Sequence, residues 1–135
     1  MSESEGGAPR AVVAGHGDFA GGIVSAVQQI TGRGDAFVTL SNRDMSAQDV
    51  ERALREHVEA GGLTVIFTDL PAGSCTMAAR RLQRERPGTV IVTGTNLATL
   101  LDFVFHTDVP PGTAAQHAAE KGRAALVVMG APGGY

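Results

Sequence analysis

The sequence has a single cysteine, Cys75, among 135 residues, so an internal disulfide is excluded. A chain without disulfides is typical of a reducing compartment, and the cytoplasm is the expected location. Long hydrophobic runs are also missing, because none approaches the roughly 20 apolar residues that a membrane span needs. The formal net charge is only −3. We therefore expect neither nucleic acid nor a membrane surface as a direct partner.

The first nine residues are polar and acidic, so they do not resemble a secretory signal. We interpret residues 1–9 as a disordered N-terminal segment and residues 10–131 as one domain. This length, with 43% hydrophobic residues overall, is sufficient for a single hydrophobic core.

Short apolar runs alternate with helical patterns along the chain, which is typical of an α/β fold with a parallel sheet. Ser46 and Asp49 have the spacing of a capping box, and Val50, Leu54 and Val58 follow at helical intervals. Helices are expected at 19–30, 47–60, 74–86, 97–105 and 113–121. Strands are expected at 10–14, 36–40, 63–68, 89–93 and 124–129.

The most informative motif is Gly15-His16-Gly17, which joins the first apolar strand to a helix. Glycines on both sides of His16 allow backbone amides to approach whatever binds the imidazole. Helix N-termini attract anions, because unpaired N–H groups and the helix dipole point outward there. A histidine in this position suits chemistry on an anion, and phosphate is the first candidate.

A second polar loop, residues 68–74, follows the third predicted strand. If the first and third strands are neighbours, Asp69 and His16 lie on the same edge of the sheet. Asp69 could then fix the tautomer of the imidazole, and the free ring nitrogen could attack phosphorus. The Ser74 hydroxyl and the amides near Gly17 and Gly73 could hold phosphoryl oxygens. The alternative for Asp69 is that it merely caps the loop. For Ser74 we expect both roles, capping of the following helix and contact with the anion, because a cluster of cap amides is also an anion site.

The other candidate side chains are better interpreted as structural. His57 lies among charged residues of a helix, and His106 and His117 lack the spacing of a metal site. Cys75, at a helix start, is expected to be a small packed residue. Arginines on the same helix form either a solvated face or a docking surface for an acidic partner; they are Arg80, Arg81, Arg84 and Arg86.

Four blocks of the sequence carry a family resemblance: 15–26, 67–74, 93–97 and 119–123. In this order they resemble the mannose-family IIA domains of the bacterial phosphoenolpyruvate-dependent sugar phosphotransferase system. The implied fold is a single-domain three-layer α/β fold with helices on both faces of the sheet. The sheet is mainly parallel, with strand order 2-1-3-4 and a C-terminal antiparallel edge strand. That strand, residues 124–129, would be exchanged between the subunits of a homodimer.

The resemblance implies that His16 is phosphorylated by the phosphocarrier HPr and passes the phosphate to a IIB protein. Asp69 would support the imidazole, and Ser74 would contact the phosphoryl group. IIB would be a separate protein, and a membrane would be involved only through IIC and IID partners. No cofactor and no metal are expected, because amides and side chains hold the transferred group.

The sequence departs from the family pattern around this loop. Ala72, Cys75 and Met77 stand where the family usually has glycine, proline and asparagine, and Ala98 stands where proline is frequent. These positions bear on recognition of the IIB partner more directly than on phosphorylation. Two alternatives stay open: a IIA-like protein whose phosphorylation signals to a non-transport target, and a hydrolase or isomerase that uses His16 and Asp69 as a general-base pair. The transported sugar is not encoded in such a domain.

Overall fold

A computed structural model describes residues 8–130 and residue 133. Of the predicted disordered segment, residues 1–9, only residues 8 and 9 are described. The predicted end of the domain, residue 131, also lies outside the described residues. The described part of the chain contains one parallel sheet in the order β2-β1-β3-β4, as predicted. Its strands are β1 (Ala11–Gly15), β2 (Phe37–Ser41), β3 (Val65–Thr68) and β4 (Val90–Val92).

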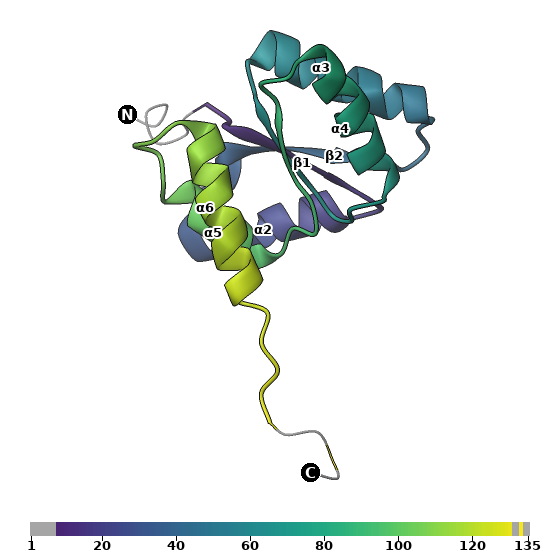
Figure 1. Cartoon of the computed structure of the whole chain (residues 1–135). Coiled ribbons are helices and arrows are strands. Elements are labelled where there is room, and N and C mark those ends of the chain that lie inside the picture. Colours follow the sequence, from purple (N-terminus) through teal and green to yellow (C-terminus); the bar gives the residue numbers. More distant parts are fainter. Residues whose placement is uncertain (1–7, 131–132, 134–135) are drawn as a thin grey trace.

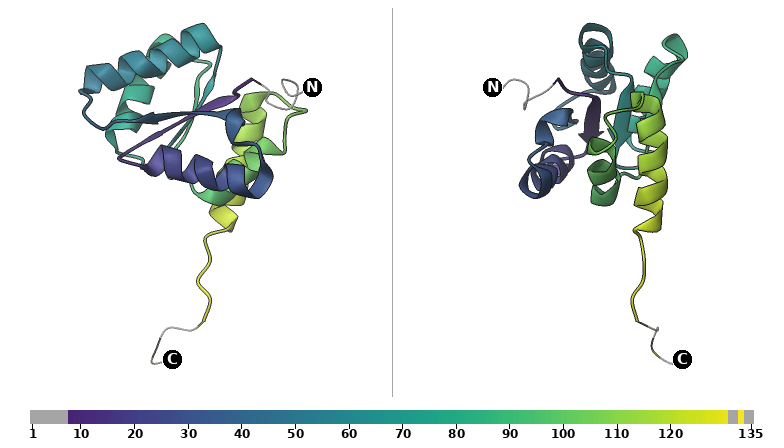
Figure 2. Two further views of the ribbon diagram at one scale, coloured as in Figure 1. Left: turned by 180° about the vertical axis from the view of Figure 1, so that it is seen from behind. Right: turned by 90° about the vertical axis from the view of Figure 1, so that its left-hand side faces the viewer.

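Helices cover both faces of this sheet (Figure 1), which gives the predicted three layers. Helices α3 and α4 lie on one face, and α2, α5 and α6 lie on the other (Figure 2). Their bounds are α2 (Phe19–Thr31), α3 (Ala47–Gly61), α4 (Ser74–Glu85), α5 (Leu97–Val104) and α6 (Pro111–Ala124). A 3-10 turn, Gly34–Ala36, precedes β2. Among the described helices, none has the length and apolar character needed to cross a membrane.

Residues of one strand alternate between two hydrophobic cores. Along β1, Ala11 and Val13 pack with α2, α5 and α6, whereas Val12 and Ala14 pack with α3 and α4. Burial on both faces explains why β1 and the first three residues of β3 are apolar rather than alternating with polar residues.

The predicted start of α3 is confirmed in detail. The Asp49 backbone N–H donates to the Ser46 hydroxyl, and the Ser46 N–H donates to the Asp49 carboxylate. Because these two bonds satisfy amides that have no partner within the helix, they define its first turn.

The predicted C-terminal strand at 124–129 is not formed in this chain. Ala124 is the last residue of α6, and residues 125–130 form no strand and extend away from the domain (Figure 1). The apolar, β-branched composition predicted a strand, but a strand also needs an unpaired edge within reach. Helix α6 directs this segment away from its own sheet. The side chains of Leu126, Val128 and Met129 are therefore at least 85% exposed.

Candidate functional site

The candidate site lies at the carboxyl ends of three adjacent strands. His16 follows β1, Asn42 follows β2 and Asp69 follows β3. The chain passes from β1 to β2 on one side and places β3 on the other, so the strand order reverses at β1. Open parallel sheets bind ligands at such a reversal, because the loops on its two sides diverge there.

Asp69 holds His16 at two points. Its Oδ2 atom accepts a 2.9 Å hydrogen bond from the His16 backbone N–H and lies 2.8 Å from the ring atom Nδ1. The ring must donate from Nδ1 to an ionised carboxylate, so the lone pair is left on Nε2. The His16 side chain is 49% exposed and the Asp69 side chain only 11%. The geometry presents one nucleophilic nitrogen to solvent and hides the carboxylate that orients it.

Asp69 is kept ionised by its contacts with His16. Burial is the largest influence on the Asp69 carboxyl and by itself would raise its pKa. Hydrogen bonds from the His16 backbone N–H and from its ring outweigh burial and hold the pKa of Asp69 below its ordinary value. Thr76 stabilises the loop that carries Asp69. Its hydroxyl donates to the Leu70 carbonyl and contacts the buried Thr68 hydroxyl.

Two glycines permit the close approach of the loops. A Cβ atom at Gly73 would lie 2.9 Å from Cε1 of His16, and one at Gly15 would lie 2.9 Å from Oδ2 of Asp69. A side chain at Gly73 would displace the imidazole, and one at Gly15 would displace the carboxylate and the Phe19 ring, which would lie 2.6 Å from its Cβ atom. Gly17 has a φ of 52°, in the region that favours glycine.

Ser74 does not cap its helix, so the capping role predicted for it was wrong. Gly73 is the N-cap residue, and Ser74 is the first residue of α4. The Ser74 hydroxyl instead accepts a 2.8 Å hydrogen bond from the Asn42 side-chain amide. The hydroxyl keeps its own proton for donation, and the first amides of α4 have no partner within the helix. The start of α4 thus places several donors beside the His16 ring.

Asn42 was not identified from the sequence. It follows β2 directly, as His16 follows β1 and Asp69 follows β3. The position of polar residues immediately after parallel strands could have identified it, since the carboxyl ends of all three strands share one edge. The prediction from the sequence considered only the ends of the first and third strands, so Asn42 was missed.

Cys75 is a packed residue, as expected. Its side chain is fully buried in the core shared by α3 and α4. Burial, helped by the negative charge of Asp69, raises the pKa of the thiol to about 11. The helix start does not activate it, because the loss of solvation outweighs the helix dipole.

We expect Cys75 to react with a disulfide reagent such as 5,5′-dithiobis(2-nitrobenzoate) about 10²-fold more slowly in the native chain than in the unfolded chain. At pH 8 only about one thiol in a thousand would be ionised in the native state. Absorbance of the released thiolate measures both rates. Equal rates would show that the thiol is accessible.

Exposed side chains around the site are apolar on one side. Leu70 is 55% exposed and Met77 46% exposed, within one loop and the first turn of α4. Two members of the predicted basic cluster, Arg81 of α4 and Arg86 directly after that helix, pair with Glu51 and Glu59 of α3. These contacts occupy half of the cluster and favour an intramolecular role for it over an acidic docking surface.

The remaining histidines lie away from His16. His57 is partly exposed on α3. His106 and His117 come together with Asp102 of α5. Arg10, immediately before β1, donates to the carbonyl oxygen of His106. This cluster is therefore near the start of β1, at the opposite end of the strand from His16.

Comparison with known proteins gives one family. The family described as "PTS system fructose IIA component" matches residues 10–120. The mannose/sorbose-specific IIA subunit from Enterococcus faecalis has a TM-score of 0.74 and 22% identity, over 93% of this chain and 98% of that one. The phosphotransferase system component EIIA from Streptococcus agalactiae has a TM-score of 0.69 and 24% identity, over 84% and 93%. A sigma-54 interaction domain protein from Enterococcus faecalis has a TM-score of 0.63 and 18% identity, over 85% and 90%. A search of curated proteins finds no match.

Proposed function

Because the chain belongs to the mannose-type IIA family of the phosphotransferase system, we propose that it is a histidine phosphocarrier. His16 accepts a phosphoryl group from phosphorylated HPr and donates it to a separate IIB protein, in support of sugar uptake and phosphorylation. Both exchanges join proteins that work in the cytoplasm. The observation that carries the proposal is the exposed His16 ring, oriented through Nδ1 by the Asp69 carboxylate.

The phosphoryl group is carried by Nε2 of His16. The Nε2 lone pair forms the new bond to phosphorus while the bond from phosphorus to the HPr histidine breaks, and that histidine retains the bonding electrons. The His16 ring gains positive charge in this step. The proton on Nδ1 stays in place, and the ionised Asp69 at 2.8 Å balances the charge.

The phosphoryl oxygens are held by donors at the ends of the loops. The amides of Gly17 and Gly73 and the hydroxyl of Ser74 lie in the segments that border the ring. Transfer between phosphohistidines involves little covalent participation by other groups, so positioning and charge stabilisation account for most of the rate. No metal is required for this step.

We expect Asp69→Asn to slow phosphorylation by HPr by about 10²–10⁴-fold while the fold is retained. The amide lacks the negative charge that balances the ring. The amide also has an NH₂ group, which can take either of two positions. In the position of Oδ2 it faces the His16 N–H, which is itself a donor. In the position of Oδ1 it is buried where the described residues provide no hydrogen-bond partner. Rapid-quench measurement of phosphate incorporation gives the rate. A rate equal to that of the unmodified chain would make Asp69 only a loop residue.

A second candidate function is regulatory: phosphorylation of His16 would signal to a protein outside sugar transport. The observation that favours it is the exposed Met77, where the family usually has asparagine, next to the exposed Leu70. One structural neighbour is described as a sigma-54 interaction domain protein. Transfer from phosphorylated His16 to a cognate IIB protein decides between the two. Stable phosphorylation with no transfer to any IIB partner favours regulation.

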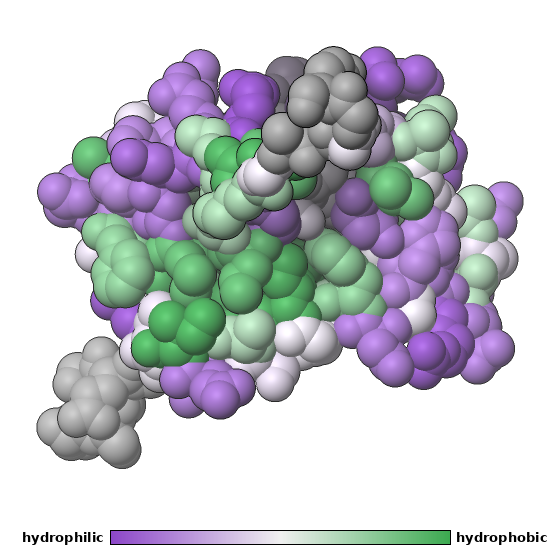
Figure 3. Space-filling model, turned by 90° about the horizontal axis from the view of Figure 1, so that it is seen from below, coloured by the Kyte–Doolittle hydropathy of each residue, from purple (hydrophilic) through white to green (hydrophobic). Residues whose placement is uncertain are grey.

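A homodimer is the proposed assembly. An unbroken hydrophobic area lies on the face from which the C-terminal segment extends (Figure 3). Helix α2, on this side of the sheet, has no charged residue, and Asp102 is the only one in α5. The four residues from Leu126 to Met129 are between 60% and 90% exposed. In a dimer, the segment 126–129 of each copy would join the free edge of the sheet in the other copy. The second copy would then cover both the hydrophobic area and this segment.

A further inference from the structure

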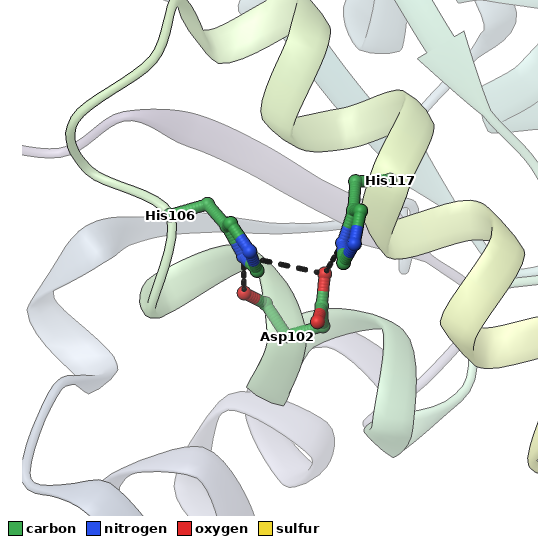
Figure 4. A group of neighbouring side chains, drawn as sticks. All are labelled: Asp102, His106 and His117. Carbon is green, nitrogen blue, oxygen red and sulfur yellow. Dashed lines mark hydrogen bonds and ion pairs between the residues drawn. The ribbon is translucent and has the colours of Figure 1, made fainter.

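Asp102, His106 and His117 form a cluster that the phosphoryl-transfer site does not use. Asp102 lies on α5, His106 two residues beyond its end, and His117 on α6. The Asp102 Oδ2 atom is 2.7 Å from Nδ1 of His117 and 3.5 Å from Nδ1 of His106. The Nδ1 atom of His106 lies closer, at 2.9 Å, to the backbone carbonyl oxygen of Asp102. Both imidazoles point toward the carboxylate, with their ring centres 4.4 Å apart (Figure 4). Three potential metal ligands therefore converge from two helices.

The spacing of the ligand atoms is compatible with a small divalent ion. One ligand atom from each residue can be chosen so that all three lie within 4.8 Å of one another. Around a tetrahedral ion with bonds near 2.0–2.1 Å, ligand atoms are about 3.3 Å apart. The two distances from the carboxylate bracket this value. The third distance, between the two imidazole nitrogens, is within 4.8 Å.

Electrostatics at the end of α5 also favour a cation. Asp102 lies in the last turn of α5, where the helix dipole is negative and a carboxylate is unfavourable. Among the described residues, its only ion-pair partners are His106 and His117. The guanidinium of Arg10 is bonded not to this carboxylate but to the carbonyl oxygens of His106 and Val109. Arg10 thereby holds the loop after α5 and keeps His106 in position.

We propose that these three side chains bind one Zn²⁺ ion or a similar divalent transition metal, with water in the open position. Two imidazoles and one carboxylate are a ligand set for such metals, whereas Mg²⁺ and Ca²⁺ need more oxygen ligands. The ion would link α5 to α6, from which the exposed C-terminal segment continues. The site is at the opposite end of β1 from His16, so it is independent of the phosphocarrier proposal.

Metal-free protein without a histidine tag provides the test. Calorimetric titration with ZnSO₄ is expected to give one ion per chain, and Asp102→Asn and His117→Ala are expected to weaken binding at least 10-fold. Matched controls are His57→Ala, a histidine outside the cluster, and His16→Ala, which removes the other His–Asp pair. Both are expected to bind Zn²⁺ as tightly as the unmodified chain.

Thermal unfolding keeps the test valid if a variant is less stable, because each variant is compared with its own metal-free midpoint. Zn²⁺ at about 100 times its Kd is expected to raise the unfolding midpoint of the unmodified chain by about 5–10 °C. The midpoint of Asp102→Asn is expected not to rise. Mg²⁺ is expected to leave the midpoint of the unmodified chain unchanged. The proposal is overturned if micromolar Zn²⁺ does not bind, if Asp102→Asn binds equally well, or if His16→Ala abolishes binding. None of these results bears on the proposal that His16 is phosphorylated, which is tested separately by phosphate uptake.

Discussion

The His16→Ala variant is expected to take up no phosphate from phosphoenolpyruvate, enzyme I and HPr, whereas the unmodified chain takes up one acid-labile phosphate. Alanine removes the only nitrogen that Asp69 orients toward solvent. The variant should still fold, because the Asp69 carboxylate keeps its hydrogen bond from the backbone N–H of residue 16. Intact-protein mass spectrometry at neutral pH, with and without acid treatment, measures the modification.

Three alanine variants serve as matched controls for this result: His57→Ala, His106→Ala and His117→Ala. Each removes an imidazole that lies outside the site, so each should be labelled to the same extent as the unmodified chain. Labelling that persists in His16→Ala would refute the assignment of His16. Turnover of a small substrate without phosphoenolpyruvate would instead favour the hydrolase or isomerase alternative.

Deletion of residues 125–135 is expected to convert a dimer into a monomer. The expected dimer mass is about 28 kDa, twice the 13.9 kDa chain. The deletion removes the exposed run from Leu126 to Met129 but leaves α6 intact, since that helix ends at Ala124. Light scattering at micromolar concentration measures the mass of both proteins.

A shorter deletion, of residues 131–135, keeps the apolar run and should remain dimeric. The double substitution Leu126→Glu with Val128→Glu keeps the length of the chain and should be monomeric, because buried charges oppose pairing of this segment with a second copy. A monomeric unmodified chain would refute the dimer. A dimer that survives the longer deletion would refute the role of the segment.

The sequence was sufficient for the strands of the sheet and for the polar residues that follow β1 and β3. The family resemblance supplied the sheet order, which the structure confirms. Apolar runs such as Val12–Ala14 indicate these strands, because strands buried on both faces consist mainly of apolar residues. Once the strands are known, parallel pairing brings the residues that follow β1 and β3 to one edge. The capping box of α3 could also be predicted from the sequence, because its two hydrogen bonds join residues within a stretch of four.

What the sequence alone determined is therefore local: strands, helix starts and the residues that immediately follow each strand. Only the tertiary structure decided the contacts between distant segments. It paired Asn42 with Ser74 and brought His117 to Asp102, and it left residues 125–130 outside the sheet. The physical reason is that local patterns depend on which side chains are apolar and on short-range hydrogen bonds. Contacts between separate elements depend instead on how the packed layers orient them, and a strand at a chain end depends on whether a free edge is within reach.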